Sequence, residues 1–359
     1  WVTLVVVPLT LLGTLLVLPW PWAGAWLLKA AALAMAALWP VLTFLSHVPV
    51  AQWLQPAPAV WSYLPAALGT LWLLAPAVMP ARWLGAVLLA PMILVDPPRP
   101  AAGEAWFTLL DVGQGLSAVV QTARHTLVFD AGPAIPGGFD AGSAVLVPFL
   151  RHFGLSRVDT LIVSHGDLDH RGGVATLLAQ TTVGRVVSSV PDRIAWPAGT
   201  VEPCQAGEGW SWDGVDFALL YPPRDRPYRG NDASCVLRVR AGGHSLLLPG
   251  DIERRREDMM LQADPQQLAA DIIVAPHHGS ATSSTAAFVD AVRPEFVLFA
   301  VGYRNRYGFP RAGVAARYAA EGARRLDTAH EGAIRFRLGP GPLAPHAYRH
   351  AARRYWNAR

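Results

Sequence analysis

The chain has 359 residues, a formal net charge of +4 at pH 7 and 52% hydrophobic residues, with a mean hydropathy of +0.27. This length allows two domains, and the apolar composition excludes an ordinary soluble enzyme over the whole chain. Up to residue 100 the only charged side chains are Lys29, Arg82, Asp96 and Arg99. From residue 101 on, the chain has 27 basic residues (30 minus 3) and 25 acidic residues (26 minus 1). This nearly balanced charge gives no support for nucleic acid as a partner.

Four apolar runs fill the first hundred residues. Val2–Leu18 and Trp22–Leu45 are each near the length that spans a hydrocarbon core of ~30 Å, so we predict two membrane helices. Leu64–Val78 and Trp83–Val95 are shorter, which indicates tilted, proline-flanked helices or the halves of a re-entrant pair. A single signal peptide would not explain four runs. Because the chain begins at Trp1, inside an apolar run, we expect its N-terminal part to be missing.

Composition divides the chain into parts. We predict transmembrane and interfacial helices over 1–95, with the tryptophan- and proline-rich segment 46–63 at the membrane interface. Segment 96–103 is a linker by its proline and glycine content, and 104–340 is an α/β domain. The basic, aromatic tail 341–359 either touches nucleic acid or lipid headgroups or is a solvated end. The few charges in the first part do not fix a membrane orientation.

Short apolar runs bounded by turn residues predict the elements of the α/β domain. Strands and helices alternate in two halves, which favours an αββα sandwich with two sheets face to face and helices outside. The predicted strands are 107–110, 118–121, 126–129, 160–163, 215–220, 234–240, 244–248, 271–275 and 295–300, and the predicted helices are 143–153, 174–178, 283–292, 312–321 and one starting at Glu253.

The segment SHGDLDHRGG, residues 164–173, holds two histidines and two carboxylates: His165, Asp167, Asp169 and His170. A strand that ends in alternating ligands lets the first pair point to one side and the second pair to another, which can hold two metal ions close together. An acidic turn with helix-capping aspartates would explain one of the aspartates but not both histidines.

The spacing H-x-D-x-D-H resembles the H-x-H-x-D-H signature of the metallo-β-lactamase fold, with Asp167 in place of the second histidine. A carboxylate at that position makes manganese as suitable as zinc. The stretches LLDVGQGLSAVV, LVFDAGP, NDASCVLRV, LLLPGDIE and APHHGS follow in the order found in the C-terminal domain of ComEC, the membrane protein of DNA uptake in natural competence. The chain resembles that family over about 104–340.

The resemblance implies two divalent metal ions, zinc or manganese. Asp251 would bridge both ions, although a Gly-Asp pair after a strand is also a usual helix N-cap. Either His277 or His278 would complete the second metal, and the other is then free to act on substrate phosphate. The implied ligands are His165, Asp167, Asp169, His170, Asp251, His277 and His278.

Catalytic roles are implied for Asp130, Asp169 and Asp251. In the resembled fold Asp130 orients the metal loop from behind the ligands, whereas the residues alone also allow an ordinary turn aspartate at a strand end.

Two further segments hold candidate substrate contacts. Many relatives have another histidine on the first metal where this chain has Asn231, Asp232, Ala233 and Ser234. Asn231 or Asp232 could take that position, water or substrate could do so, or the segment is a structural turn.

The segment GYRNRYGFPR, residues 302–311, contains Arg304, Asn305 and Arg306. Arginines interleaved with tyrosines suit a phosphate backbone with stackable bases, and a polar loop in an arginine-rich chain is the alternative. Phe309 stands where some relatives have histidine, so no metal or acid–base role is available there.

Cys204 and Cys235 are the only cysteines. They could form a disulfide in an oxidising compartment or remain two buried thiols, and the resemblance to a domain that meets DNA outside the cytoplasmic membrane favours the disulfide.

The resemblance implies a multi-pass protein of the cytoplasmic (inner) membrane whose extracytoplasmic domain degrades the DNA strand that is not imported. Its partners would be single- or double-stranded DNA, membrane lipid and other competence DNA-uptake proteins. Two alternatives remain: a DNA-guiding domain whose metal site is structural or vestigial, and a phosphoesterase for a small substrate such as a choline phosphoester.

Overall fold

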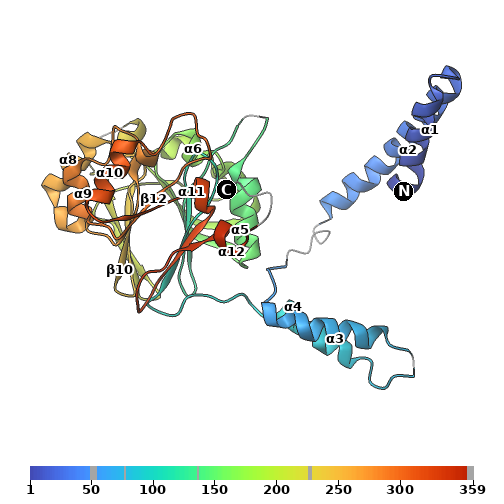
Figure 1. Ribbon diagram of the computed structural model, residues 1–359, viewed down its shortest axis with the longest axis horizontal. Coiled ribbons are helices and arrows are strands. Elements are labelled where there is room, and N and C mark those ends of the chain that lie inside the picture. The colour runs from blue at the N-terminus through green and yellow to red at the C-terminus, as the bar shows by residue number, and fades with distance from the viewer. Residues whose placement is uncertain (49–54, 77, 136, 225–228, 354–359) are drawn as a thin grey trace. The chain divides into compact units, whose positions relative to one another are not determined.

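A computed structural model of the chain divides it into two compact units, 1–55 and 56–359 (Figure 1). The linker predicted at 96–103 lies inside the second unit, and the division falls at Gln55 and Pro56. The structure describes residues 1–48, 55–76, 78–135, 137–224 and 229–353.

The first unit is a pair of apolar helices. A π-helical turn, Val2–Val6, leads into α1 (Val7–Leu16), and α2 (Pro21–His47) follows after a short turn. Both α-helices have proline in the first turn, where its missing N–H leaves no hydrogen bond unmade. Among the described residues, α2 is the one helix long and apolar enough to cross a membrane, and the other apolar helices have 10 to 17 residues. The membrane run predicted at the N-terminus is therefore helical but shorter than α2.

The second unit begins with a helical hairpin. The helices α3 (Tyr63–Leu74) and α4 (Leu84–Leu94) pack closely where Gly69 meets Gly85. A Cβ atom at either glycine would lie 2.5 Å from the carbonyl oxygen of the other, so a larger residue would force the helices apart. Of the segment predicted at the membrane interface, residues 49–54 lie outside the described residues.

The rest of this unit contains two sheets. The first has the order β15-β14-β1-β2-β3-β4-β5-β6, and the second has the order β13-β12-β11-β10-β9-β8-β7. The strands of the first sheet are β1 (Ala105–Leu109), β2 (Ser117–Gln121), β3 (Thr126–Ala131), β4 (Arg157–Val163), β5 (Thr182–Ser188), β6 (Glu202–Pro203), β14 (Ile334–Leu338) and β15 (His346–Ala347). Those of the second are β7 (Gly209–Trp212), β8 (Val215–Tyr221), β9 (Val236–Ala241), β10 (His244–Leu248), β11 (Ile272–Val274), β12 (Phe296–Phe299) and β13 (Arg324–Asp327).

Helices cover the outer faces of both sheets. In Figure 1, α8, α9 and α10 lie on one side of the domain and α5 on the other. The α-helices of the domain are α5 (Val147–His152), α6 (Leu168–Arg171), α7 (Val174–Gln180), α8 (Arg254–Ala263), α9 (Ala286–Val292), α10 (Ala312–Ala320), α11 (Thr328–Glu331) and α12 (Tyr348–Ala351).

Three apolar clusters confirm the predicted αββα sandwich. The first fills the space between the sheets and includes Phe107, Phe296 and Phe336, all fully buried. The second packs α8, α9 and α10 on the second sheet, and the third packs α5 and α7 on the first. Strands such as β11 are buried on both faces, which explains why the sequence Ile-Ile-Val there is apolar without alternation.

Several strands were not predicted from the sequence. β5 begins with polar, partly exposed residues and becomes buried only at its end, so it lacks a long apolar run. β14 pairs antiparallel with β1 across more than two hundred residues of sequence. The segment predicted as a basic tail adds β15 to this edge by pairing with β14, while residues 354–359 lie outside the described part.

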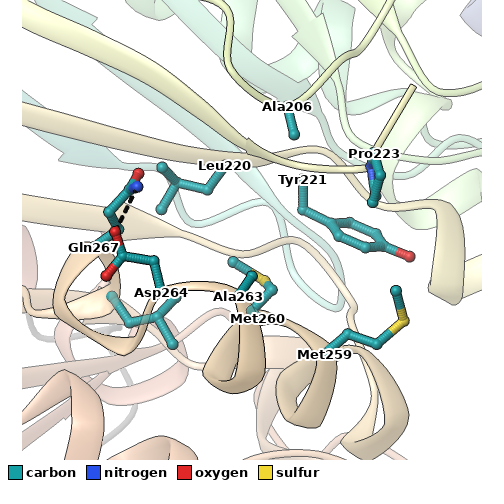
Figure 2. A pocket seen from close by; sticks show the side chains of 10 residues that line it. Ala206, Leu220, Tyr221, Pro223, Met259, Met260, Ala263, Asp264 and Gln267 are labelled. Atoms are coloured by element: carbon teal, nitrogen blue, oxygen red, sulfur yellow. Dashed lines mark hydrogen bonds between the residues drawn. The ribbon is translucent and has the colours of Figure 1, made fainter. Parts of the chain in front are cut away.

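A small apolar pocket of about 300 Å³ lies between β8 and α8. Figure 2 shows Leu220 and Tyr221 facing Met259 and Met260 across it. No candidate metal ligand lines this pocket, so it is separate from the site described next.

Candidate metal centre

The candidate ligands lie on loops that follow three strands, β4, β10 and β11, and Asp130 lies at the end of a fourth strand, β3. β3 and β4 are parallel neighbours in the first sheet, and β10 and β11 are parallel neighbours in the second. Because parallel strands end at the same edge of a sheet, the loops after them gather at one edge of the sandwich. The candidate ligands on these loops form two overlapping groups.

Each group has three ligand atoms within 4.8 Å of one another. His165, His170 and Asp251 form the first group, and Asp169, His170 and His278 form the second. The Nε2 atom of His170 lies 3.2 Å from Asp251 Oδ1 and 3.2 Å from His278 Nε2. His278 Nε2 is also 3.3 Å from Asp169 Oδ2 and 3.5 Å from Asp251 Oδ2. Ligands more than eighty residues apart in sequence therefore converge, with His170 and Asp251 at the centre.

Asp130 fixes the orientation of His170. Its carboxylate accepts hydrogen bonds from the Ser164 backbone N–H at 2.7 Å and from the Ser164 hydroxyl at 2.6 Å. The same carboxylate lies 2.7 Å from His170 Nδ1, so Nε2 of that ring is directed at the cluster. Asp130 has a φ of 58°, a left-handed conformation that aspartate tolerates better than most residues. Its carboxylate thus lies behind the candidate ligands, between Ser164 and the His170 ring.

His277 and His278 have different surroundings. The turn after β11 places both residues in the left-handed region, with φ of 50° and 57°. His278 is buried, and its Nδ1 lies 2.9 Å from the Ala300 carbonyl, which directs Nε2 at the cluster. The His277 side chain is 22% exposed, and its Nδ1 lies 3.1 Å from Thr282 Oγ1 and 3.4 Å from Glu253 Oε1. His278 therefore completes the second group, and His277 lies at its rim.

The loop that carries Asp251 depends on a glycine. Gly250 has a φ of 58°, and a Cβ there would lie 2.9 Å from Ser234 Cβ and 3.1 Å from Ser164 Cβ. Ser234 is buried, and its hydroxyl accepts a hydrogen bond from the Asp251 N–H at 3.0 Å. Ser234, predicted as a substrate contact, thus holds the backbone of a ligand instead.

The electrostatics of the cluster couple its acids and bases. Burial disfavours the charged form of His170, yet Asp251 and Asp130 hold its pKa well above the usual range. Burial likewise acts against the Asp251 carboxylate, but His170 and His278 hold its pKa well below the usual range. Burial raises and the His278 hydrogen bond lowers the pKa of Asp169, with a net value of about 2. The acids of the cluster are therefore anionic at neutral pH.

The donor set fits a divalent cation. Within the described residues, His165 Nε2 is buried without a hydrogen-bond partner, and Asp251 Oδ1 makes no well-aligned hydrogen bond and has only the 3.2 Å ion-pair contact with His170 Nε2. Such orphaned atoms cost free energy in a dry interior unless something binds them. Imidazole nitrogens and carboxylate oxygens are ligands of zinc, manganese and iron. The fold and these residues together imply bound divalent metal ions.

Asp167 lies outside both ligand groups. Its side chain is 57% exposed, and its Oδ2 is 3.7 Å from His165 Nε2. The alternation assumed from sequence fails because the strand ends at Val163 and the chain enters α6 with Asp167 as the N-cap. Asp167 therefore borders the cluster from its open side.

Asn231 and Asp232 also lie outside both groups. Asn231 Nδ2 donates to Glu253 Oε1 at 3.4 Å, and Asp232 pairs with Arg256 at 2.9 Å. These contacts tie the turn to α8 and its N-terminus.

The arginine-rich loop, residues 302–311, lies beside His277. The Phe309 ring centroid is 6.0 Å from that of His277. The guanidinium groups of Arg304 and Arg306 lie over Tyr303 and Tyr307, at 5.2 and 4.9 Å from the ring centroids. Asn305 shapes the loop instead of facing outward: its amide donates to the Phe309 carbonyl at 2.7 Å and accepts from the Phe309 N–H at 2.9 Å.

Three residues that order the site were missed from the sequence. Ser164 bridges Asp130 to the metal loop, and Glu253 and Thr282 hold His277. The position of Ser164, immediately before His165, was the only available signal.

Cys204 and Cys235 form a disulfide that links the ends of the two sheets, and the Cys235 N–H donates to the Ser164 carbonyl at 2.9 Å.

Comparison with known proteins gives the class first. The sequence profile of the metallo-β-lactamase superfamily matches residues 110–302, which contain all of these ligands, and the chain belongs to that superfamily. Three curated relatives then narrow the class. The chain is 34% identical to competence protein ComA of Neisseria gonorrhoeae over 342 residues, which cover 95% of this chain and 47% of the relative.

The other two relatives are similar over shorter stretches. Recombination protein 2 of Haemophilus influenzae is 32% identical over 58% of this chain and 26% of its own length. ComE operon protein 3 of Bacillus subtilis is 28% identical over 68% of this chain and 34% of its own length. Together they identify a ComEC-family competence protein, and the chain spans about half or less of the length of these relatives.

Proposed function

We propose that this chain is part of a DNA-uptake protein and that its metal centre hydrolyses phosphodiester bonds of DNA, degrading the strand that is not imported. The observation that carries the proposal is the convergence of His165, His170, Asp251 and His278 on one buried cluster with unsatisfied ligand atoms. The choice of DNA as the substrate rests on the relatives' names, which refer to competence and recombination.

The chain's own residues would divide the work of hydrolysis. Divalent cations bound by the cluster would supply a water of lowered pKa and would draw charge from the phosphoryl oxygens. Asp130 and Ser164 keep His170 in one orientation, which holds the ligand geometry during turnover. His277 lies at the rim with its Nε2 4.0 Å from Asp251, where it can donate a hydrogen bond to a phosphate oxygen.

The arginine-rich loop, 302–311, would hold the substrate backbone. Arg304 and Arg306 are exposed, and each lies over a tyrosine ring that is also exposed. Guanidinium groups bind phosphate oxygens, and aromatic rings stack on unpaired bases. The loop thus offers both contacts beside His277.

The N-terminal helices would anchor this domain in the cytoplasmic membrane. Apolar side chains such as Leu33, Leu64 and Leu74 are 70 to 77% exposed on α2 and α3, as expected of helices that face lipid. We further propose that the chain is multi-pass and that the sandwich lies on the extracytoplasmic side. The Cys204–Cys235 disulfide supports that side, because disulfides persist in oxidising compartments. The partners of the protein would be lipid, DNA and other uptake proteins.

Cleavage of labelled DNA by the purified full chain tests the proposed reaction. We expect cleavage that requires zinc or manganese, disappears with a chelator and is lost in Asp251→Ala. Asp258→Ala is the matched control, because Asp258 is an exposed carboxylate on α8. Comparing single- and double-stranded substrates identifies the form of DNA that is cut. Metal-dependent cleavage that survives Asp251→Ala would refute the assignment.

A non-catalytic, DNA-guiding domain is the second candidate. The position of Asp167 favours it, because the first group keeps only one ligand, His165, besides the two at the centre of the cluster. The same preparation distinguishes the two. Stoichiometric metal without cleavage of DNA or of a chromogenic phosphodiester would establish a structural metal site.

A further inference from the structure

A groove of about 1020 Å³ lies away from the metal centre, over the edge of the first sheet. Its walls come from β1, β14, α5 and α12, and from Tyr303 at the start of the arginine-rich loop. No metal ligand lines it. Its volume is at the upper end of the ~300–1,000 Å³ that ligand sites occupy, which leaves room for more than one nucleotide-sized group.

Arg335 is the cation that distinguishes this groove. The residue is half-buried on β14, its Nε donates to Thr108 Oγ1 at 3.1 Å, and its guanidinium lies 4.2 Å from the Phe153 ring centroid. Within the described part of the chain, no carboxylate pairs with it. A partly buried charge without a counter-ion costs free energy. The cation–π partners of this guanidinium are the rings of Phe153, Trp106 and Phe149, with centroids at 4.2, 5.8 and 5.9 Å. The remaining N–H donors suit an anion.

The neighbouring cation shows the contrast. Arg349 lines the same groove but is paired with Asp111, at 2.7 Å from its carboxylate. Two histidines, His152 and His346, also line the groove, and Asp111 is the one acidic residue among the lining residues. The charge balance of the groove therefore favours an anionic ligand over a cationic one.

Aromatic rings give the groove a second kind of contact. Tyr348 is 59% exposed and Tyr303 is 46% exposed, and both line it together with Phe149. A guanidinium fork binds phosphate through paired hydrogen bonds, and exposed aromatic faces stack on bases that are not already paired. A single-stranded nucleic acid offers both groups at once, whereas the bases of a duplex are covered.

One wall of the groove continues to the metal centre. The segment after β1 starts at Asp111 in the groove and reaches Leu116, whose N–H donates to the carbonyl of Asp169 at 3.0 Å. Gly302, next to Tyr303, donates to the side chain of Gln114 in the same segment at 3.3 Å. A strand that occupied the groove would thus lie along the loops that border the metal centre.

We propose that this groove binds a segment of single-stranded DNA, with Arg335 on a phosphate and Tyr348 and Tyr303 against bases. The choice of DNA as ligand rests on the proposed function. The contacts themselves require no metal and no catalysis.

The test is equilibrium binding of a fluorescent oligothymidylate to the full chain in detergent, with a chelator present so that nothing is cleaved. We expect Arg335→Ala to weaken binding about tenfold, the scale for a hydrogen bond to a charged group. The slope of log affinity against log salt should also decrease by about 0.7, as for one lost phosphate contact to a single strand. Arg337→Ala is the matched control, because Arg337 is an exposed cation on the same strand that does not line the groove.

Tyr348→Ala gives an independent measurement at a position that is 59% exposed. It should weaken binding about fivefold or more, the scale for losing one base–aromatic stack. Unchanged affinity in Arg335→Ala or in Tyr348→Ala would overturn the inference, and so would an equal loss in Arg337→Ala. Arg335-dependent binding of duplex DNA or of polyglutamate with the same affinity would overturn the ligand assignment.

The two proposals can fail separately. A chain that binds single strands through Arg335 but cleaves no DNA with any metal would refute the proposed hydrolysis and support the groove. A chain that cleaves DNA but shows wild-type binding in either groove variant would refute the groove alone.

Discussion

The helical part and the sandwich bury opposite kinds of residue. In α1 and α2 the buried residues are Gly13, Gly24 and Ala31, while large apolar side chains such as Leu33 are exposed. In the sandwich the apolar side chains are inside, and the charged cluster around His170 is buried with them. The difference supports the proposed membrane anchor for the helical part. Helices in hydrocarbon gain little by hiding leucine and associate through small residues, whereas charges leave water only when other ligands replace it.

The charged interior is most easily broken at its centre. His170→Ala removes a ligand from both groups and leaves Asp130 and Asp251 buried without their cationic partner. We expect phosphodiester hydrolysis to fall by at least about 10³-fold, as when one member of a catalytic unit is removed. The metal-free chain should lose about 3–5 kcal/mol of stability, as when one partner of a buried pair is removed. Hydrolysis assays and denaturant unfolding measure the two effects.

The exposed His330 provides the control for that variant, since its side chain is 64% exposed and lies outside both groups. His330→Ala should keep wild-type metal content and activity. Wild-type activity in His170→Ala would show that the buried charges serve only the fold.

A milder change tests the support behind the ligands. Asp130→Asn keeps the shape of the side chain but removes the charge that faces His170 Nδ1. We expect metal affinity and activity to fall about 10–100-fold, the usual effect of losing such a partner. Competition with a chromophoric chelator measures the affinity. An unchanged affinity would mean that Ser164 alone orients the ring.

The pH dependence of metal binding sharpens the comparison further. The raised pKa of His170 means that the metal-free cluster holds a proton that a cation must displace. Below that raised pKa, metal affinity should fall by about tenfold per pH unit. Calorimetry in buffers of different ionisation enthalpy counts the released proton. Release of no proton at neutral pH would contradict this prediction.

The raised pKa of His170 also determines how the stability of the metal-free chain depends on pH. The charged His170 stabilises the metal-free fold fully below the ordinary histidine pKa, and this contribution is lost as pH rises through the raised value. The melting temperature of the chelated chain should therefore fall on the alkaline side. With metal bound, the fall should be smaller because the cation replaces the proton.

The smallest effect is expected on the helical side. Gly69→Val would place a branched side chain against the Gly85 carbonyl and should destabilise the α3–α4 pair by about 1–3 kcal/mol. Hydrogen exchange of the two helices in detergent would report it. Gly313→Val is the control, because a Cβ on that exposed glycine of α10 meets nothing within 4 Å. Equal protection of α3 and α4 in both variants would show that the close contact is dispensable.

The sequence was most informative where a strand ends in a ligand. Asp130, His165 and Asp251 each follow an apolar run, and a strand-end motif can be recognised without knowing its neighbours. The sandwich was predictable for the same reason, since its central strands are continuous apolar runs. The exposed ends of β5 and the edge strand β15 were not, because polar residues at an edge carry no periodic signal.

Directions of side chains could not be read from spacing. His277 and His278 are adjacent and chemically identical, and only the left-handed turn decides which one faces the cluster. Asp167 satisfies the motif but leaves the cluster because α6 begins directly after it. Asn231, Asp232 and Asn305 were predicted as substrate contacts. In the fold their side chains contact Glu253, Arg256 and Phe309 respectively.

The position of His170 in both groups has a consequence for metal loading. An imidazole nitrogen has one lone pair, and Nδ1 of this ring faces Asp130, so only Nε2 can bind an ion. Two ions therefore cannot each have three protein ligands from these groups. The first would take His170, and the second would enter with His165 and Asp251 and would have to recruit Asp167 or solvent. A titration should therefore show two unequal steps, with the weaker ion exchanging faster than the stronger one.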